Sequence, residues 1–132
     1  MTTPIRFGTD GWRGIIGEDF TEENAARVVQ AAAEVWAAET GGTGCPLVVG
    51  YDTRRLSREV AKLAAGILAA NGWAVLLADR PVPTPLVSFT VVDRAAAGGL
   101  VVTASHNPAR FNGIKLKAAF GGSAAPELTA RV

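Results

Sequence analysis

The sequence predicts an α/β fold, a three-layer α/β/α sandwich around a mixed, mostly parallel sheet. Three observations lead to this expectation: 132 residues fit one compact domain, 48% of them are hydrophobic, and short β-branched runs alternate with amphipathic stretches. Strands that alternate with helices are joined by right-handed crossovers, which place the helices on both faces of a largely parallel sheet.

The first third of the chain contains an expected loop, a helix and a strand. Glycines at positions 8, 11, 14 and 17 predict a shaped loop over residues 5–17 rather than a regular element. Thr21 can cap a helix whose apolar side chains recur at three- and four-residue steps, and the glycines of residues 41–44 end it. Residues 47–51 form a short apolar run that is typical of a buried strand.

Two further helices frame the middle of the chain. Ser57 is expected to cap a helix that stops at Asn71-Gly72, and a strand follows at residues 74–78. The Thr84-Pro85 pair offers a capping hydroxyl followed by a proline in the first turn, so it predicts a third helix to about residue 92.

The last third of the chain contains expected strands over residues 100–103 and 114–117, and from Pro126 the first turns of a helix that the C-terminus cuts short. Ligands of doubly wound sheets lie outside the carboxyl ends of the strands. Three polar loops satisfy that rule here: residues 52–55, 79–84 and 104–112.

Composition excludes several classes of function. Thirteen Lys and Arg residues against twelve Asp and Glu residues give a net charge of +1, which disfavours sequence-independent binding to nucleic acid. One cysteine and one histidine can form neither an internal disulfide nor a Cys/His zinc cluster. The N-terminus lacks the apolar core of a signal peptide, and no stretch is apolar for long enough to span a bilayer. We therefore expect a cytoplasmic protein without a membrane or nucleic-acid partner.

The segment of residues 103–108, TASHNP, offers a possible nucleophile. A serine at the end of a strand, in a turn that a proline stiffens, is well placed for such a role, although Ser, Asn and Pro also dominate ordinary polar turns. Ser105 and His106 are sequence neighbours whose side chains diverge if the backbone is extended, and no second histidine is available. The G-x-S-x-G motif is also absent, so the sequence disfavours a serine hydrolase.

Phosphoryl transfer fits the residues better than acyl transfer does. It requires mainly positioned donors and cations. The expected strand ends supply glycine N–H groups and six candidate cations: Arg13, Arg54, Arg55, His106, Lys115 and Lys117. Arg and Lys are equally common as solvated surface residues, so spacing alone does not distinguish these cations from a solvated surface.

Four segments carry a resemblance to a known family. They are FGTDGWRG at 7–14, GYDTR at 50–54, PTP at 83–85 and VTASHNPARFNGIKLK at 102–117. They resemble, in order and over nearly the whole chain, the N-terminal domain of the α-D-phosphohexomutases. The opening FGTDGWRG and the ending KLKAAFGGSA, at 115–124, are more similar to the phosphoglucomutase/phosphomannomutase branch than to the phosphoglucosamine branch.

The resemblance implies a mechanism and a set of site residues. Ser105 would carry the transferable phosphate, give it to a hexose monophosphate, and recover the other phosphate from a bound 1,6-bisphosphate. Mg²⁺ would bind the phosphate on Ser105 and an acidic loop outside this chain, and glucose 1,6-bisphosphate would act as activator. Lys115 would move a proton at the sugar hydroxyl or stabilise its charge, and Arg13 would brace the phosphoserine. His106 would orient the serine or contact substrate, unless it is only a turn residue, and Asn107 would bind phosphate or hold the loop.

The family has four domains, and the magnesium, sugar-reading and distal phosphate loops of the other three do not occur in this chain. We therefore expect residues 1–132 to be the phosphoserine-bearing domain, truncated in its last helix, whose partners are the other domains and a hexose phosphate. Alone it should be inactive. The alternative is a stand-alone, non-catalytic phosphosugar-binding or regulatory domain of the same fold. Glucose or mannose phosphates are the expected substrates.

Overall fold

The computed structural model describes residues 5, 11–105 and 107–122. In chain order the elements are β1 (Trp12–Ile15), α1 (Glu22–Thr40), β2 (Leu47–Tyr51), α2 (Ser57–Ala70), β3 (Val75–Leu77), α3 (Thr84–Asp93), β4 (Gly98–Val102) and β5 (Phe111–Lys117). The expected helices and strands are therefore confirmed in order and type, with small differences at their ends. The helix expected from Pro126 lies outside the described residues.

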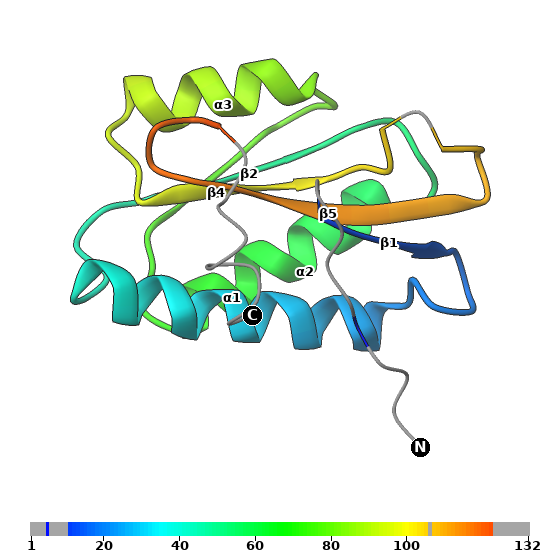
Figure 1. Cartoon of the computed structure of the whole chain (residues 1–132), viewed down its shortest axis with the longest axis horizontal. Helices are drawn as coiled ribbons and strands as arrows, with labels where there is room; N and C mark the ends of the chain where they lie inside the picture. The colour runs from blue at the N-terminus through cyan, green and yellow to red at the C-terminus, as the bar shows by residue number, and fades with distance from the viewer. Residues whose placement is uncertain (1–4, 6–10, 106, 123–132) are drawn as a thin grey trace.

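A five-stranded sheet in the order β1-β5-β4-β2-β3 forms the middle layer. The strand pairs β2–β3 and β2–β4 are parallel, whereas β4–β5 and β1–β5 are antiparallel. In Figure 1, α1 and α2 cover one side of the sheet and α3 covers the other. The expected α/β/α sandwich with a mixed sheet is confirmed, and β4 is its middle strand.

The expectation of a loop over residues 5–17 was wrong for Trp12–Ile15, which form β1. The segment is short and its glycines hide the alternation, but Trp12 is buried and Arg13 is exposed. The glycines fit a strand because a side chain at Gly113 would collide with the carbonyl oxygen of Trp12 across the β1–β5 pair. Strand pairing, rather than local propensity, decides this element.

Two of the three expected helix caps were also wrong. Thr21 accepts a hydrogen bond from the backbone N–H of Asn24, as expected at the start of α1. At α2 the cap position is Leu56, and Ser57 is the first helical residue, with its hydroxyl bonded elsewhere. At α3 the cap position is Pro83, and Thr84 makes no capping bond.

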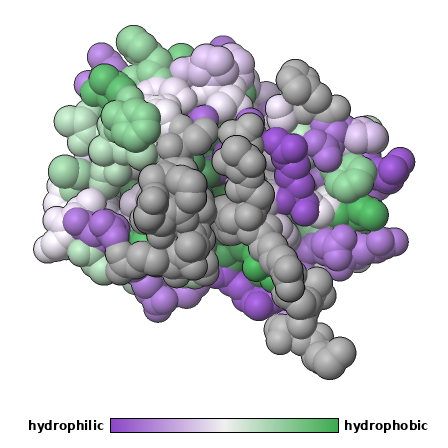
Figure 2. Space-filling view, in the orientation of Figure 1, coloured by the Kyte–Doolittle hydropathy of each residue, from purple (hydrophilic) through white to green (hydrophobic). Residues whose placement is uncertain are grey.

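The core is thick on one face of the sheet and thin on the other. Ile114, Leu116 and Leu100 pack with residues of α1 and α2 in a large cluster. The opposite faces of β2 and β4 contact α3 through a small cluster that includes Val87 and Val91. The outer side of α3 keeps exposed apolar side chains, and Figure 2 shows the hydrophobic colour gathered over this helix. They include Leu86, Phe89 and Val92.

Candidate functional site

The loop that follows β4 places Ser105 at the carboxyl end of the middle strand, as the sequence predicted. Ser105 is partly buried and has a φ of 56°, a left-handed conformation that costs a non-glycine residue about 1–2 kcal/mol. Such a conformation persists only where neighbouring contacts enforce it. The surroundings of Ser105 therefore have to supply those contacts.

A chain of hydrogen bonds leads from Asp52 to the backbone of Ser105. The Thr103 hydroxyl donates to Asp52 Oδ2 over 2.6 Å, and its oxygen accepts from the Ser105 N–H over 3.1 Å. The other carboxylate oxygen of Asp52 accepts from the Ser57 hydroxyl at 2.7 Å and from the Arg54 N–H at 2.9 Å. Asp52 thus joins the β2 loop to the serine loop, 51 residues further along the chain.

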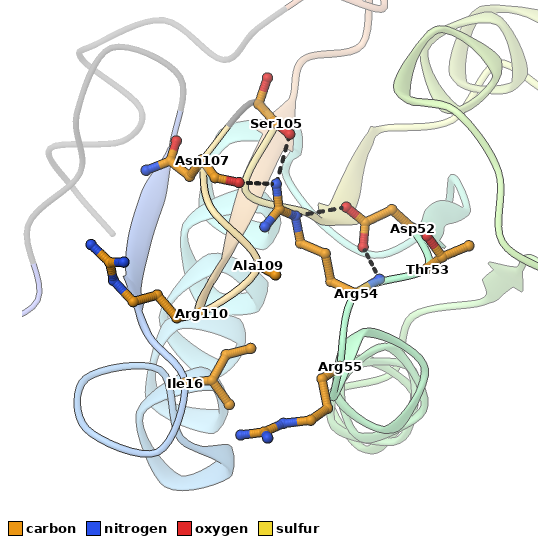
Figure 3. Close-up of a pocket in the computed structure, with 9 residues that line it drawn as sticks. All are labelled: Ile16, Asp52, Thr53, Arg54, Arg55, Ser105, Asn107, Ala109 and Arg110. Atoms are coloured by element: carbon orange, nitrogen blue, oxygen red, sulfur yellow. Dashed lines mark hydrogen bonds and ion pairs between the residues drawn. The ribbon is translucent and has the colours of Figure 1, made fainter.

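Arg54 holds the same loop through its carbonyl groups. Its Nη2 donates to the carbonyl oxygens of Ser105 at 2.8 Å and Asn107 at 2.6 Å. Its Nη1 donates to those of Pro108 at 2.9 Å and Phe111 at 3.1 Å. Its Nε forms an ion pair with Asp52 Oδ2 at 3.4 Å. All three guanidinium nitrogens are therefore engaged by the protein, as Figure 3 shows in part.

A buried asparagine extends this network into the core. Asn112 is fully buried on β5, and its side-chain amide donates to the Arg55 carbonyl oxygen and the Ser57 hydroxyl, both at 2.9 Å. The sequence analysis did not single out Asn112, which lies between Phe111 and Gly113 on β5. The local pattern could not give its partners, which are 55 and 57 residues away.

The structure brings two of the expected site residues together. Arg13 on β1 donates from Nη1 to the side-chain oxygen of Asn107 over 3.1 Å. Lys115 on β5 is partly buried and lies opposite Val101. Because Arg13 pairs with Gly113, two residues before Lys115, both cations lie on the face of the sheet that bears α3. Among the described residues no hydrogen bond joins Lys115 to Ser105. His106 lies outside the described residues.

Beside the serine loop lies an open hollow of about 830 Å³. Figure 3 shows Arg55, Arg110 and Ile16 on one side of it, and the Ser105 side chain directed away from Arg54. The Ser105 hydroxyl is thus separate from the groups that hold its backbone. Of the candidate cations, Arg54 is used to hold the loop, whereas Arg55 is exposed on the rim. Arg110, which the sequence analysis did not single out, is exposed there as well.

The described residues do not form a magnesium site. No group of three or more His, Cys, Asp or Glu residues among them is arranged to hold a metal ion. Asp52, the carboxylate beside the serine loop, is already bonded through both of its oxygens to protein donors.

Outside the loop, a hydrogen bond from Arg80 lowers the pKa of Asp79, and both side chains are exposed. No described helix is long and apolar enough to cross a membrane.

Comparison with known proteins gives a consistent assignment. Residues 4–132 match the family model described as phosphoglucomutase/phosphomannomutase, alpha/beta/alpha domain I. A phosphoglucosamine mutase from Clavibacter sepedonicus is 41% identical over 132 residues, covering 98% of this chain and 29% of that protein. A phosphoglucomutase from Staphylococcus epidermidis is 38% identical, covering 100% of this chain and 24% of that protein. The chain thus spans less than a third of these relatives.

Solved structures match in the same way. A Thermus thermophilus protein assigned as a phosphomannomutase has a TM-score of 0.93 and 45% identity, covering 99% of this chain and 29% of that chain. The phosphoglucomutase pp63/parafusin from Paramecium has a TM-score of 0.85 at 23% identity, covering 97% of this chain and 26% of that chain, a likeness of fold alone.

Proposed function

The chain belongs to the phosphoglucomutase/phosphomannomutase family as its α/β/α domain I, and from that premise we propose that it supplies the phosphoserine of a phosphohexomutase. The complete enzyme would interconvert hexose 1-phosphate and hexose 6-phosphate through a bound 1,6-bisphosphate. One observation carries this proposal. Ser105 stands at the end of the middle strand with its N–H and carbonyl oxygen both bonded, while its hydroxyl points away from the groups that hold it.

The reaction consists of two reversible phosphoryl transfers. Phosphorylated Ser105 gives its phosphoryl group to a free hydroxyl of the hexose monophosphate: the P–Oγ bond breaks, a P–O bond to the sugar forms, and the sugar hydroxyl loses its proton. After the bisphosphate turns over, its other phosphate returns to Ser105 Oγ. Such chemistry depends on positioning and charge stabilisation more than on covalent work by the protein.

Lys115 and Arg13 have complementary roles in this proposal. Lys115 takes or returns the proton of the sugar hydroxyl or stabilises its charge, and Arg13 braces the phosphate on Ser105. The hydrogen bond from Arg13 to Asn107 supports the second role, because it places the guanidinium against the serine loop. His106 would orient the serine or contact the substrate. A Mg²⁺ ion held by other parts of the complete enzyme would meet this domain only through the phosphate on Ser105.

Glucose and mannose phosphates are the proposed substrates, with glucose 1,6-bisphosphate as activator. The opening and closing motifs, FGTDGWRG and KLKAAFGGSA, support this choice. Relatives of the chain include both phosphoglucosamine mutases and phosphoglucomutases, so the sugar has to be measured. Turnover of glucose 1-phosphate, mannose 1-phosphate and glucosamine 1-phosphate by the complete enzyme would rank them.

The proposed function is tested by Ser105→Ala in the complete mutase. We expect mutase activity to be abolished, the fold to be retained, and the phosphate carried by the wild-type protein to be absent by mass spectrometry. Ser88→Ala on α3 is a matched control that should keep both activity and phosphate. Retained turnover in Ser105→Ala would contradict the proposal. Tight binding of glucose 1-phosphate by this chain without any turnover would favour the stand-alone binding domain instead.

A further inference from the structure

We propose that Arg54 is a positioning residue for phosphoryl transfer, which fixes the backbone of Ser105 so that the serine hydroxyl faces the substrate. The inference rests on the proposed function of Ser105. It assigns to Arg54 a geometric role instead of direct binding of phosphate.

The first step in the argument is the conformation of Ser105. Its φ of 56° is unfavourable for a residue with a side chain, so an isolated loop would abandon it. Both polar groups of the Ser105 backbone are bonded in this conformation: the N–H donates to Thr103 Oγ1, and the carbonyl oxygen accepts from Arg54 Nη2. Each bond leads back to Asp52, directly from Arg54 and through the hydroxyl of Thr103. One carboxylate thus anchors the serine from two sides.

The second step is the use of the guanidinium donors. An arginine offers five N–H donors in a planar fork. Each of the two terminal nitrogens of Arg54 donates two hydrogen bonds, so that four different carbonyl oxygens of residues 105–111 are bound. Its Nε forms an ion pair with Asp52. Its side chain is only 15% exposed, and its charge is balanced by the Asp52 carboxylate. A phosphate on Ser105 therefore finds no free donor on Arg54.

The third step is that no other side chain fits these contacts. Lysine has one ammonium group with three donors and no fork, so it cannot reach four carbonyl oxygens around a plane. It keeps the positive charge, however. Arg54→Lys therefore separates the two roles: a residue that acts by charge tolerates the change, and a residue that acts by geometry does not.

The test compares Arg54→Lys with Arg94→Lys in the complete mutase. Arg94 directly follows α3, its side chain is exposed, and it does not line the hollow beside the serine loop. For Arg54→Lys we expect kcat to fall about 10- to 100-fold, the scale of a 1 Å misplacement, with KM changed less than about twofold. Arg94→Lys should keep the wild-type kcat. A thermal melt confirms that both variants are folded at the assay temperature.

Chemical rescue adds a readout that a general loss of structure would not give. Arg54→Ala leaves a gap of guanidinium shape, so millimolar guanidinium ion should restore part of kcat, whereas ammonium ion should not. Arg94→Ala should respond to neither ion. A crystal structure of Arg54→Lys should show Ser105 outside the left-handed region or its carbonyl group turned away.

The outcomes separate the two claims. An inactive wild-type enzyme overturns the proposed function itself. An active wild type with an equally active Arg54→Lys variant overturns the role of Arg54, and so does a variant whose loss lies in KM alone. Equal rescue by guanidinium and ammonium ions would show that charge is what Arg54 supplies, which also contradicts the inference.

Discussion

The two faces of the central sheet differ in the size of the hydrophobic core packed against them and in the charged groups they carry. The face beneath α1 and α2 is packed by large buried side chains, among them Leu100 and Ile114, both fully buried. The other face is covered by α3 over β2 and β4 through a small cluster of mostly valines. Beyond α3, on β1 and β5, that second face presents the exposed Arg13 and the partly buried Lys115.

This difference separates stability from chemistry. Buried apolar area stabilises the fold in proportion to its extent, so the face with α1 and α2 should carry most of the stability. Among the described residues, Arg13 and Lys115 on this face keep contact with solvent beside the α3 layer, which makes it the more open face. Arg13 bonds to the serine loop through Asn107 from this face. The domain therefore keeps its reactive groups away from its main core.

The largest effect on stability is expected for a substitution on the face that packs against α1 and α2. Leu100→Ala removes a fully buried side chain of β4 from the α1/α2 core and should lower the free energy of unfolding by about 2–5 kcal/mol. Val101→Ala, one residue later on the α3 face, removes two methyl groups and should cost about 1.6 kcal/mol, at about 0.8 for each. Urea unfolding measures both. A larger loss in Val101→Ala would contradict the comparison.

An intermediate effect tests how α3 approaches the sheet. Gly50 lies on β2 directly beneath α3, and a Cβ added there would collide with a methyl group of Val87. Gly50→Ala should therefore destabilise the protein by about 1–3 kcal/mol through overpacking.

The matched control for Gly50→Ala lies on the solvent side of α2. Gly66 is an exposed helical glycine with open space around it, so Gly66→Ala should raise the free energy of unfolding by about 0.5–1 kcal/mol. Opposite signs in the two urea midpoints would support the close contact of α3. A neutral Gly50→Ala would show that α3 moves away from the sheet without cost.

The smallest expected effect on stability accompanies a large effect on activity. Lys115→Met keeps the length of the side chain on the open face, so the free energy of unfolding should change by less than about 0.5 kcal/mol. In the complete mutase, kcat should fall by about 10²- to 10⁴-fold, the range of general acid–base catalysis, with little change in KM. A loss confined to KM would assign Lys115 to substrate binding instead.

Local sequence patterns were enough to predict the three helices and the strands β2, β3 and β4. The apolar stripe of α1 and the fully buried run of Leu47–Tyr51 show their burial pattern in their own residues, whereas α3 was predicted from its Thr84-Pro85 start. The position of Ser105 followed for the same reason, since a residue just after a middle strand lies at the ligand-binding edge of the sheet. The role of Ser105 came from the resemblance and remains a proposal.

Local patterns could not predict β1 or the network behind the serine. Trp12–Ile15 is a strand because it pairs with Phe111–Ile114, about 100 residues away in the chain. Ser57 is a residue type that often caps helices, and it was expected to cap α2. Its hydroxyl donates to Asp52 instead, because the β2 loop brings that carboxylate to the start of α2.

Apart from β1, the sequence by itself determined which segments are helical or extended and which strand end bears the serine, because those properties depend on neighbouring residues. Only the tertiary structure decided how the serine is held. The strand order sets β2 beside β4, so Asp52 and Arg54 reach a loop that lies 51 or more residues further along the chain. Hydrogen bonds over such separations are fixed by the packing of the sheet, and no local pattern encodes them.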